Sequence, residues 1–148
     1  MKFYRNGNYV VCMKGDGTKI RRCDGDEFIP QFAENVDVKI TSRCGVGCPF
    51  CYEGCTKGGR HADLFGYRFI ESLHPYTEFA INGNDMDHPD LERFLVFLKC
   101  RKVFANITVH QNQFMSNYDL IKSYVESGLV HGIGISYNHY DELFIAKK

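Results

Sequence analysis

The alternation of strand and helix patterns from Val36 onward is the feature that most limits what this chain can fold into. Strand patterns occur at 36–40, 77–81, 106–111 and 131–136, and helical patterns occur at 63–73, 88–98 and 117–127. Because the connections are short, successive strands are expected to lie parallel and to be joined by right-handed crossovers. The sequence therefore predicts an α/β domain with about four parallel strands.

A small β element is expected to precede this domain. Two strand patterns, 9–13 and 18–21, flank Gly15-Asp16-Gly17, which is a strong signal for a β-hairpin. We therefore expect an N-terminal hairpin or meander over residues 1–35 and an α/β domain over residues 36–148.

Composition excludes several classes of protein. The 18 Lys and Arg residues balance the 18 Asp and Glu residues, so no global field favours nucleic acid as a partner. No apolar run approaches the roughly 18 residues of a membrane span, and the first residues do not resemble a signal peptide. We expect a cytoplasmic protein, in which seven cysteines act as ligands or free thiols rather than as disulfides.

Three of these cysteines follow the first core strand. Cys44, Cys48 and Cys51 have the spacing C-x-x-x-C-x-x-C. One loop can thus supply three thiolates to a [4Fe–4S] cluster, which normally takes four, so one iron would stay open for chemistry. Gly45 and Gly47 allow the main chain to curl tightly between the ligands.

A structural zinc site is the alternative for these three cysteines. Zinc takes four ligands, and Cys55 or His61 could supply the fourth. Zinc sites usually pair two C-x-x-C segments, and the sequence has no second one, which favours the cluster. Cys55 could instead be a free thiol or lie near a substrate.

The cysteine spacing, together with Phe50 before the last cysteine, resembles the signature of the radical S-adenosylmethionine (radical SAM) superfamily. The resemblance implies a partial (βα) barrel with the cluster loop after its first strand. Cys44, Cys48 and Cys51 would then be the cluster ligands. The amine and carboxylate of S-adenosylmethionine would chelate the fourth iron, and Phe50 would lie near the adenine.

A second stretch also resembles this superfamily. Asn82-Gly83-Asn84 stands where the family has a Gly-Gly-Glu type motif, and His88-Pro89-Asp90-Leu91 follows in the family's register. The resemblance implies that Asn82, Gly83 and Asn84 receive the methionine amine, with amides in place of the family's first glycine and its acidic residue. Ser136 and Asn138 are the corresponding candidates for contact with the ribose.

The resemblance covers about four of the family's six βα units, so the chain resembles a C-terminally shortened member. It implies reductive cleavage of S-adenosylmethionine to a 5′-deoxyadenosyl radical, which abstracts hydrogen from an unidentified substrate. Partners would be an electron donor of flavodoxin or ferredoxin type and a completing subunit or a second copy. The alternative is an inactive remnant or split-protein subunit that binds iron–sulfur or zinc as an interaction module.

Two histidines are further candidates. His110, at the end of the third strand pattern, could contact a substrate or could be a satisfied polar residue at a strand end. For His88, we expect a cap at the start of the second helix rather than a metal ligand.

Overall fold

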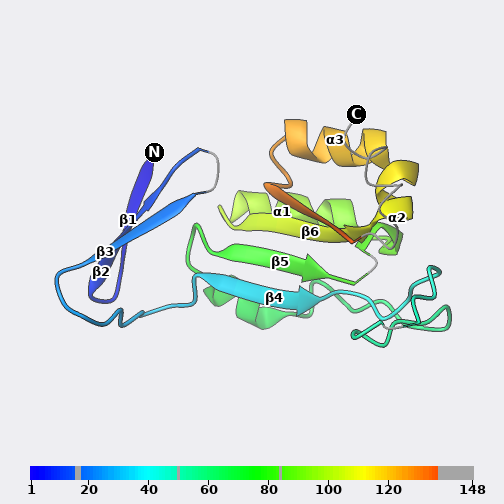
Figure 1. Cartoon of the computed structure of the whole chain (residues 1–148), viewed down its shortest axis with the longest axis horizontal. Helices are drawn as coiled ribbons and strands as arrows, with labels where there is room; N and C mark the ends of the chain where they lie inside the picture. The colour runs from blue at the N-terminus through cyan, green and yellow to red at the C-terminus, as the bar shows by residue number, and fades with distance from the viewer. Residues whose placement is uncertain (16–17, 50, 84, 137–148) are drawn as a thin grey trace. The chain divides into compact units, whose positions relative to one another are not determined.

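The computed structural model describes residues 1–15, 18–49, 51–83 and 85–136. The chain divides into two compact units, Met1–Glu34 and Asn35–Lys148 (Figure 1). Their boundary falls one residue before the one expected from the sequence. In the described part of the chain, no helix is long and apolar enough to cross a membrane.

The first unit is a three-stranded antiparallel sheet. Its strands are β1 (Lys2–Asn6), β2 (Tyr9–Met13) and β3 (Lys19–Cys23), in the order β1-β2-β3. Gly7, between β1 and β2, has a φ of 60°, a left-handed conformation that favours glycine. The expected hairpin of β2 and β3 is thus present and β1 extends it, while turn residues 16 and 17 lie outside the described residues.

A hydrogen-bonded network ties the segment after β3 to this sheet. The buried Asn6 amide donates to the Tyr9 hydroxyl at 2.9 Å and to the Phe32 carbonyl at 3.0 Å. The Glu34 carboxylate accepts from the Tyr9 hydroxyl and pairs with Arg21 at 2.7 Å. Burial, with the Glu34 contact, raises the pKa of Tyr9 to about 12, so the phenol stays a hydrogen-bond donor.

The second unit contains a four-stranded sheet with all neighbours parallel. Its strands are β4 (Asn35–Lys39), β5 (Glu78–Asn82), β6 (Phe104–His110) and β7 (Gly132–Ser136), in the order β4-β5-β6-β7. The predicted α/β unit with four parallel strands is therefore confirmed.

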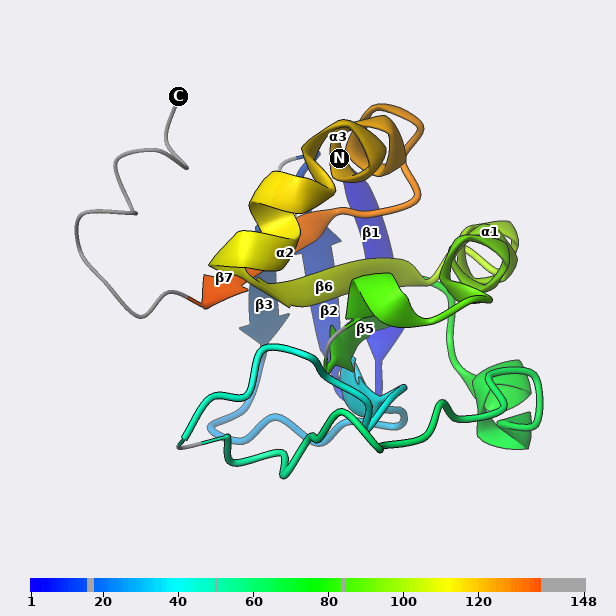
Figure 2. The same cartoon turned by 90° about the vertical axis from the view of Figure 1, so that its right-hand side faces the viewer.

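The helices of this unit are α1 (Leu91–Cys100), α2 (Gln111–Ser116) and α3 (Tyr118–Glu126), with short 3₁₀ turns η1 (Arg68–Ser72) and η2 (Asp85–Asp87). Right-handed crossovers between strands that follow one another in the sheet place successive helices on one face. Figure 2 shows α1 and α3 on the same side of the sheet. The core between these layers includes Phe79, Ile81, Phe94, Leu95, Leu98, Ala105, Ile107 and Val109.

The helix predicted over 63–73 is wrong. Only η1 is helical there, because the Asp63 side chain accepts the backbone N–H groups of Phe65 and Gly66 and forms a local turn. Leu64 and Ile70 are nevertheless buried. The apolar spacing thus identified core residues without identifying a helix.

The helix predicted over 117–127 is confirmed as α3, and a short helix that was not predicted, α2, precedes it. Asn117 separates α2 from α3, with a φ of −117° that leaves the helical region. Its side-chain amide donates to the carbonyl of Gln113 at 2.9 Å. The backbone N–H of Asn117 donates to the same carbonyl at 3.1 Å, so both groups of Asn117 satisfy the C-terminal end of α2.

Candidate functional site

Residues 44–55, which we call the cysteine loop, follow the C-terminal end of β4. Backbone pairing between the segments on either side closes the loop. Arg43 bridges Thr56 in parallel, and the N–H of Cys44 donates to the Thr56 carbonyl at 2.9 Å. The N–H of Ser42 donates to the Arg60 carbonyl at 3.0 Å. The loop is thus held at both ends beside the edge of the sheet where parallel strands build sites.

Inside the loop, Gly47 has the left-handed conformation of a tight turn, whereas Gly45, the other glycine expected to allow the curl, does not. Gly47 and Gly54 have φ values of 71° and 60°. The N–H of Cys51 donates to the Cys48 carbonyl at 3.2 Å, and the N–H of Val46 lies 3.4 Å from the Cys44 sulfur. An N–H group directed at a cysteine sulfur is one of the contacts that tune the potential of iron–sulfur clusters.

Cys44, Cys48 and Cys51 are half-buried free thiols on this one loop. In kind and number these donors fit a [4Fe–4S] cluster with one open iron. Among the described residues, however, no three His, Cys, Asp or Glu side chains converge closely enough to hold a metal ion. Holding a cluster therefore requires these thiols to turn toward one another, and the ligand assignment stays a prediction.

Cys55 lies beside Cys51. Its sulfur is 3.8 Å from the Thr41 carbonyl oxygen and also forms a hydrogen bond with Cys51. Burial raises the pKa of the Cys55 thiol; Lys39 opposes this shift, while Cys51 and Cys44 add to it. Cys55 is thus a fourth thiol near the predicted ligands. The cysteine spacing alone did not show whether Cys55 lies near them.

Lys39 connects the cysteine loop to the sheet. Its ammonium group lies 3.4 Å from the Glu53 carboxylate and donates to the Glu53 backbone carbonyl. Lys39 is the last residue of β4 and pairs in register with Asn82 of β5. The C-terminal part of the loop, at Glu53, is thereby anchored close to the position where the second predicted motif begins.

His61, the other candidate for a fourth zinc ligand, forms contacts with Thr41 and His88. Its Nδ1 lies 3.0 Å from the Thr41 hydroxyl, and its ring centroid lies 4.9 Å from that of His88. Burial lowers the pKa of His61, and the neighbouring His88 and Arg43 lower it further. These surroundings favour the neutral form of the imidazole.

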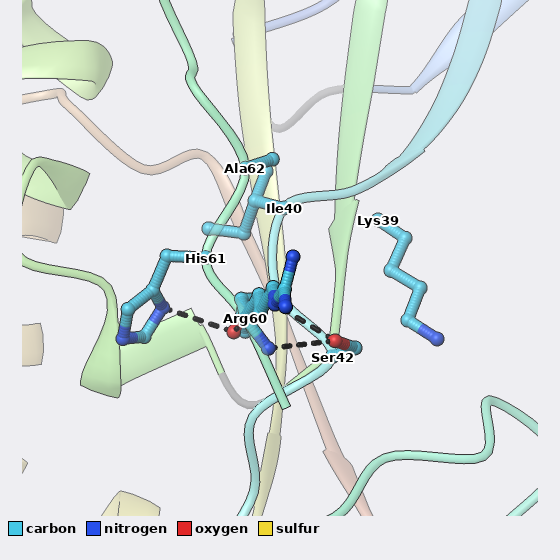
Figure 3. Close-up of a pocket in the computed structure, with 7 residues that line it drawn as sticks. Lys39, Ile40, Ser42, Arg60, His61 and Ala62 are labelled. Atoms are coloured by element: carbon cyan, nitrogen blue, oxygen red, sulfur yellow. Dashed lines mark hydrogen bonds between the residues drawn. The ribbon is translucent and has the colours of Figure 1, made fainter. Parts of the chain in front are cut away.

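An open pocket of about 210 Å³ adjoins the strands that close the loop. It is lined by Lys39, Ile40, Thr41, Ser42, Arg60, His61 and Ala62. The Ser42 hydroxyl and the Arg60 backbone hydrogen-bond in both directions, at 2.9 and 3.2 Å. Figure 3 shows Lys39 and His61 on opposite sides of Arg60. The pocket is open to solvent, and its lining combines polar groups with the apolar side chains of Ile40 and Ala62.

The predicted cofactor residues that the structure describes lie at the same edge of the sheet. Asn82 ends β5, and its backbone carbonyl accepts from the N–H of Ile40 at 3.3 Å. Gly83 follows with a φ of 111°, which favours glycine. Ser136 ends β7, in register with His110 at the end of β6. Of the other expected contacts, Phe50, Asn84 and Asn138 lie outside the described residues.

His88 and His110 both act as caps. The buried His88 donates from Nε2 to the Ala62 carbonyl at 2.9 Å, and its Nδ1 accepts from the N–H of Asp90 at 3.1 Å. The expected capping role of His88 is therefore confirmed. The Nδ1 of His110 accepts from the N–H of Asn112 at 3.2 Å, at the start of α2. This contact favours the structural interpretation of His110.

Sequence reasoning missed a polar row on the sheet face opposite the helices. Asn106 and Thr108 of β6 alternate with buried apolar residues and are directed to this other face. A Cβ on Gly132 of β7 would lie 2.7 Å from the Asn106 Oδ1, and a Cβ on Gly134 would lie 3.0 Å from the Thr108 Oγ1. The glycines of β7 thus make room for these side chains, and the alternating polar pattern of β6 was the available signal.

Comparisons with family models, with curated proteins and with solved structures found no match for this chain. The case for a function therefore rests on the chain's own residues and geometry.

Proposed function

We propose that this chain is a radical SAM protein. In this proposal Cys44, Cys48 and Cys51 hold a [4Fe–4S] cluster, and S-adenosylmethionine binds at its open iron. When bound, the cluster supplies one electron that splits the sulfonium into methionine and a 5′-deoxyadenosyl radical, which takes hydrogen from a substrate. The observation that supports this most is the C-x-x-x-C-x-x-C loop, closed at both ends and joined directly to the first strand of a parallel sheet.

The chain's own groups have distinct tasks in this proposal. The amide side chains of Asn82 and Asn84 accept hydrogen bonds from the methionine ammonium group without contributing charge. Gly83 allows close approach of the main chain, and the hydroxyl of Ser136 meets the ribose. The N–H of Val46 stabilises the thiolate of Cys44. The polar face of β6 would admit a substrate with hydrogen-bonding groups.

The wider setting follows from the same proposal. The four parallel strands would form part of a barrel of the radical SAM type in a cytoplasmic protein. A partner subunit or a second copy would complete the barrel, and a flavodoxin or ferredoxin would supply electrons. Residues that position the substrate and exclude water would then determine which hydrogen is removed.

One observation favours a second candidate, a metal-binding interaction module without catalysis. Cys55 lies beside Cys51 and close enough to Cys44 to affect its own titration, so the loop offers four thiols. Four thiolates are a common ligand set for structural zinc. In that case the loop would bind zinc and would have no open position for S-adenosylmethionine.

The assay for 5′-deoxyadenosine separates the two candidates. The protein is reconstituted anaerobically with iron and sulfide, then incubated with dithionite and S-adenosylmethionine, and the products are resolved by chromatography. We expect 5′-deoxyadenosine from the iron-loaded protein and none from a sample loaded with zinc alone. An iron-loaded protein that leaves S-adenosylmethionine intact would contradict the enzymatic proposal.

A further inference from the structure

Positive charge is concentrated around the cysteine loop although the chain as a whole is neutral. Residues 39–62 contain four basic residues and a single acidic one, whereas basic and acidic residues balance over the full sequence. Lys39 is paired with that acidic residue, Glu53. The remaining cations are Arg43, Lys57 and Arg60, which we call the cationic rim.

Backbone pairing gathers the cationic rim. The bridge between Arg43 and Thr56 places Arg43 near Lys57, and the hydrogen bonds between Ser42 and Arg60 bring Arg60 to the same pair of segments. All three rim side chains are exposed, and none forms an ion pair with another described residue. Three exposed cations on this pair of segments, none paired within the described part of the chain, create a local field that attracts an acidic partner.

The rim is also adjacent to the thiols. Arg43 immediately precedes Cys44, and Lys57 is two residues after Cys55. Both belong to the two segments that close the loop. A protein that covers the rim would therefore lie against the cysteine loop, where an electron has the shortest path to a cluster.

We propose that the cationic rim is the docking surface for an acidic one-electron donor protein. The inference rests on the proposed function: the reduced donor loses one electron and the cluster gains it. Charge complementarity of this kind speeds encounter by roughly 10- to 1,000-fold at low salt and orients the partner. Nucleic acid fits the rim less well, because binding through phosphates typically uses about 6–10 contacts and the rim has three cations.

The test uses an acidic flavodoxin and the full chain loaded with iron and sulfide. Lys57→Glu with Arg60→Glu reverses two rim charges, and Lys14→Glu with Arg68→Glu makes the same change in net charge at exposed positions outside the rim. We expect flavodoxin affinity at low salt to fall at least about tenfold in the rim variant, with a weaker salt dependence. The control should bind as the unaltered chain does.

Two readouts keep this inference separate from the proposed function. Iron content and reduction by dithionite report the cluster itself, and neither depends on the rim. If dithionite reduces the cluster while flavodoxin binds the rim variant and the control equally, the docking surface is wrong. Rim-dependent binding of a single-stranded oligonucleotide in place of flavodoxin would also overturn it. Failure of the cluster to form would instead contradict the proposed function.

Discussion

Alanine in place of Cys48 should abolish cluster assembly and leave the fold intact. A loop that supplies three thiolates cannot hold the cluster with two, because an iron is left without its protein ligand. The fold should survive because Cys48 contributes its backbone carbonyl, rather than its half-buried thiol, to the turn with Cys51. Iron and sulfide per chain after anaerobic reconstitution measure the first effect, and circular dichroism measures the second.

Two further alanine variants make the result specific. Cys100 is exposed on α1, outside the loop, so Cys100→Ala should retain the full iron content. Cys55→Ala should also retain iron if three thiols hold a cluster, but it should lose metal if four thiols hold zinc. Full iron in Cys48→Ala would refute the ligand assignment.

Alanine in place of Gly59 should open the cysteine loop without removing any thiol. A Cβ at Gly59 would lie 1.9 Å from the Ser42 carbonyl oxygen and 2.5 Å from the Arg43 nitrogen. Both are backbone atoms, so no side-chain rotation relieves the overlap, and the pairing that closes the loop must shift. We expect a loss of about 2–3 kcal/mol in the free energy of unfolding and a severalfold lower iron content.

Gly58→Ala is the matched control for this substitution. A Cβ at Gly58 meets nothing within 4 Å, so the same chemical change should be nearly neutral in stability and iron content. Thermal unfolding and iron analysis of the two variants check the prediction. Equal melting temperatures and equal iron contents would show that closure of the loop does not depend on the contact of Gly59 with Ser42.

The strands were predictable because apolar residues alternate with residues of the opposite sheet face along each strand of the parallel sheet. In β6, buried Ala105, Ile107 and Val109 alternate with residues on the opposite face, which is the pattern of a strand covered on one side. Helices were less predictable, because single polar side chains decide where they begin or break. Asp63 replaces a predicted helix with a turn, and the short helix α2, which His110 caps, was not predicted.

At the candidate site, too, some features could be predicted from the sequence and others could not. The position of the cysteine loop after β4 and of Asn82 at the end of β5 could be predicted, because both depend on local sequence and strand order. The contact between Cys55 and Cys51 and the pairing of Lys39 with Glu53 could not. These contacts depend on how segments distant in the sequence close the loop, and no spacing rule encodes that geometry.

Electron paramagnetic resonance of the reconstituted, dithionite-reduced protein tests the central claim most directly. Spectra are recorded with and without S-adenosylmethionine. A cluster with one open iron predicts a reduced-cluster signal that changes when S-adenosylmethionine is added. A signal that ignores S-adenosylmethionine, or a protein that takes up zinc and no iron, would contradict it.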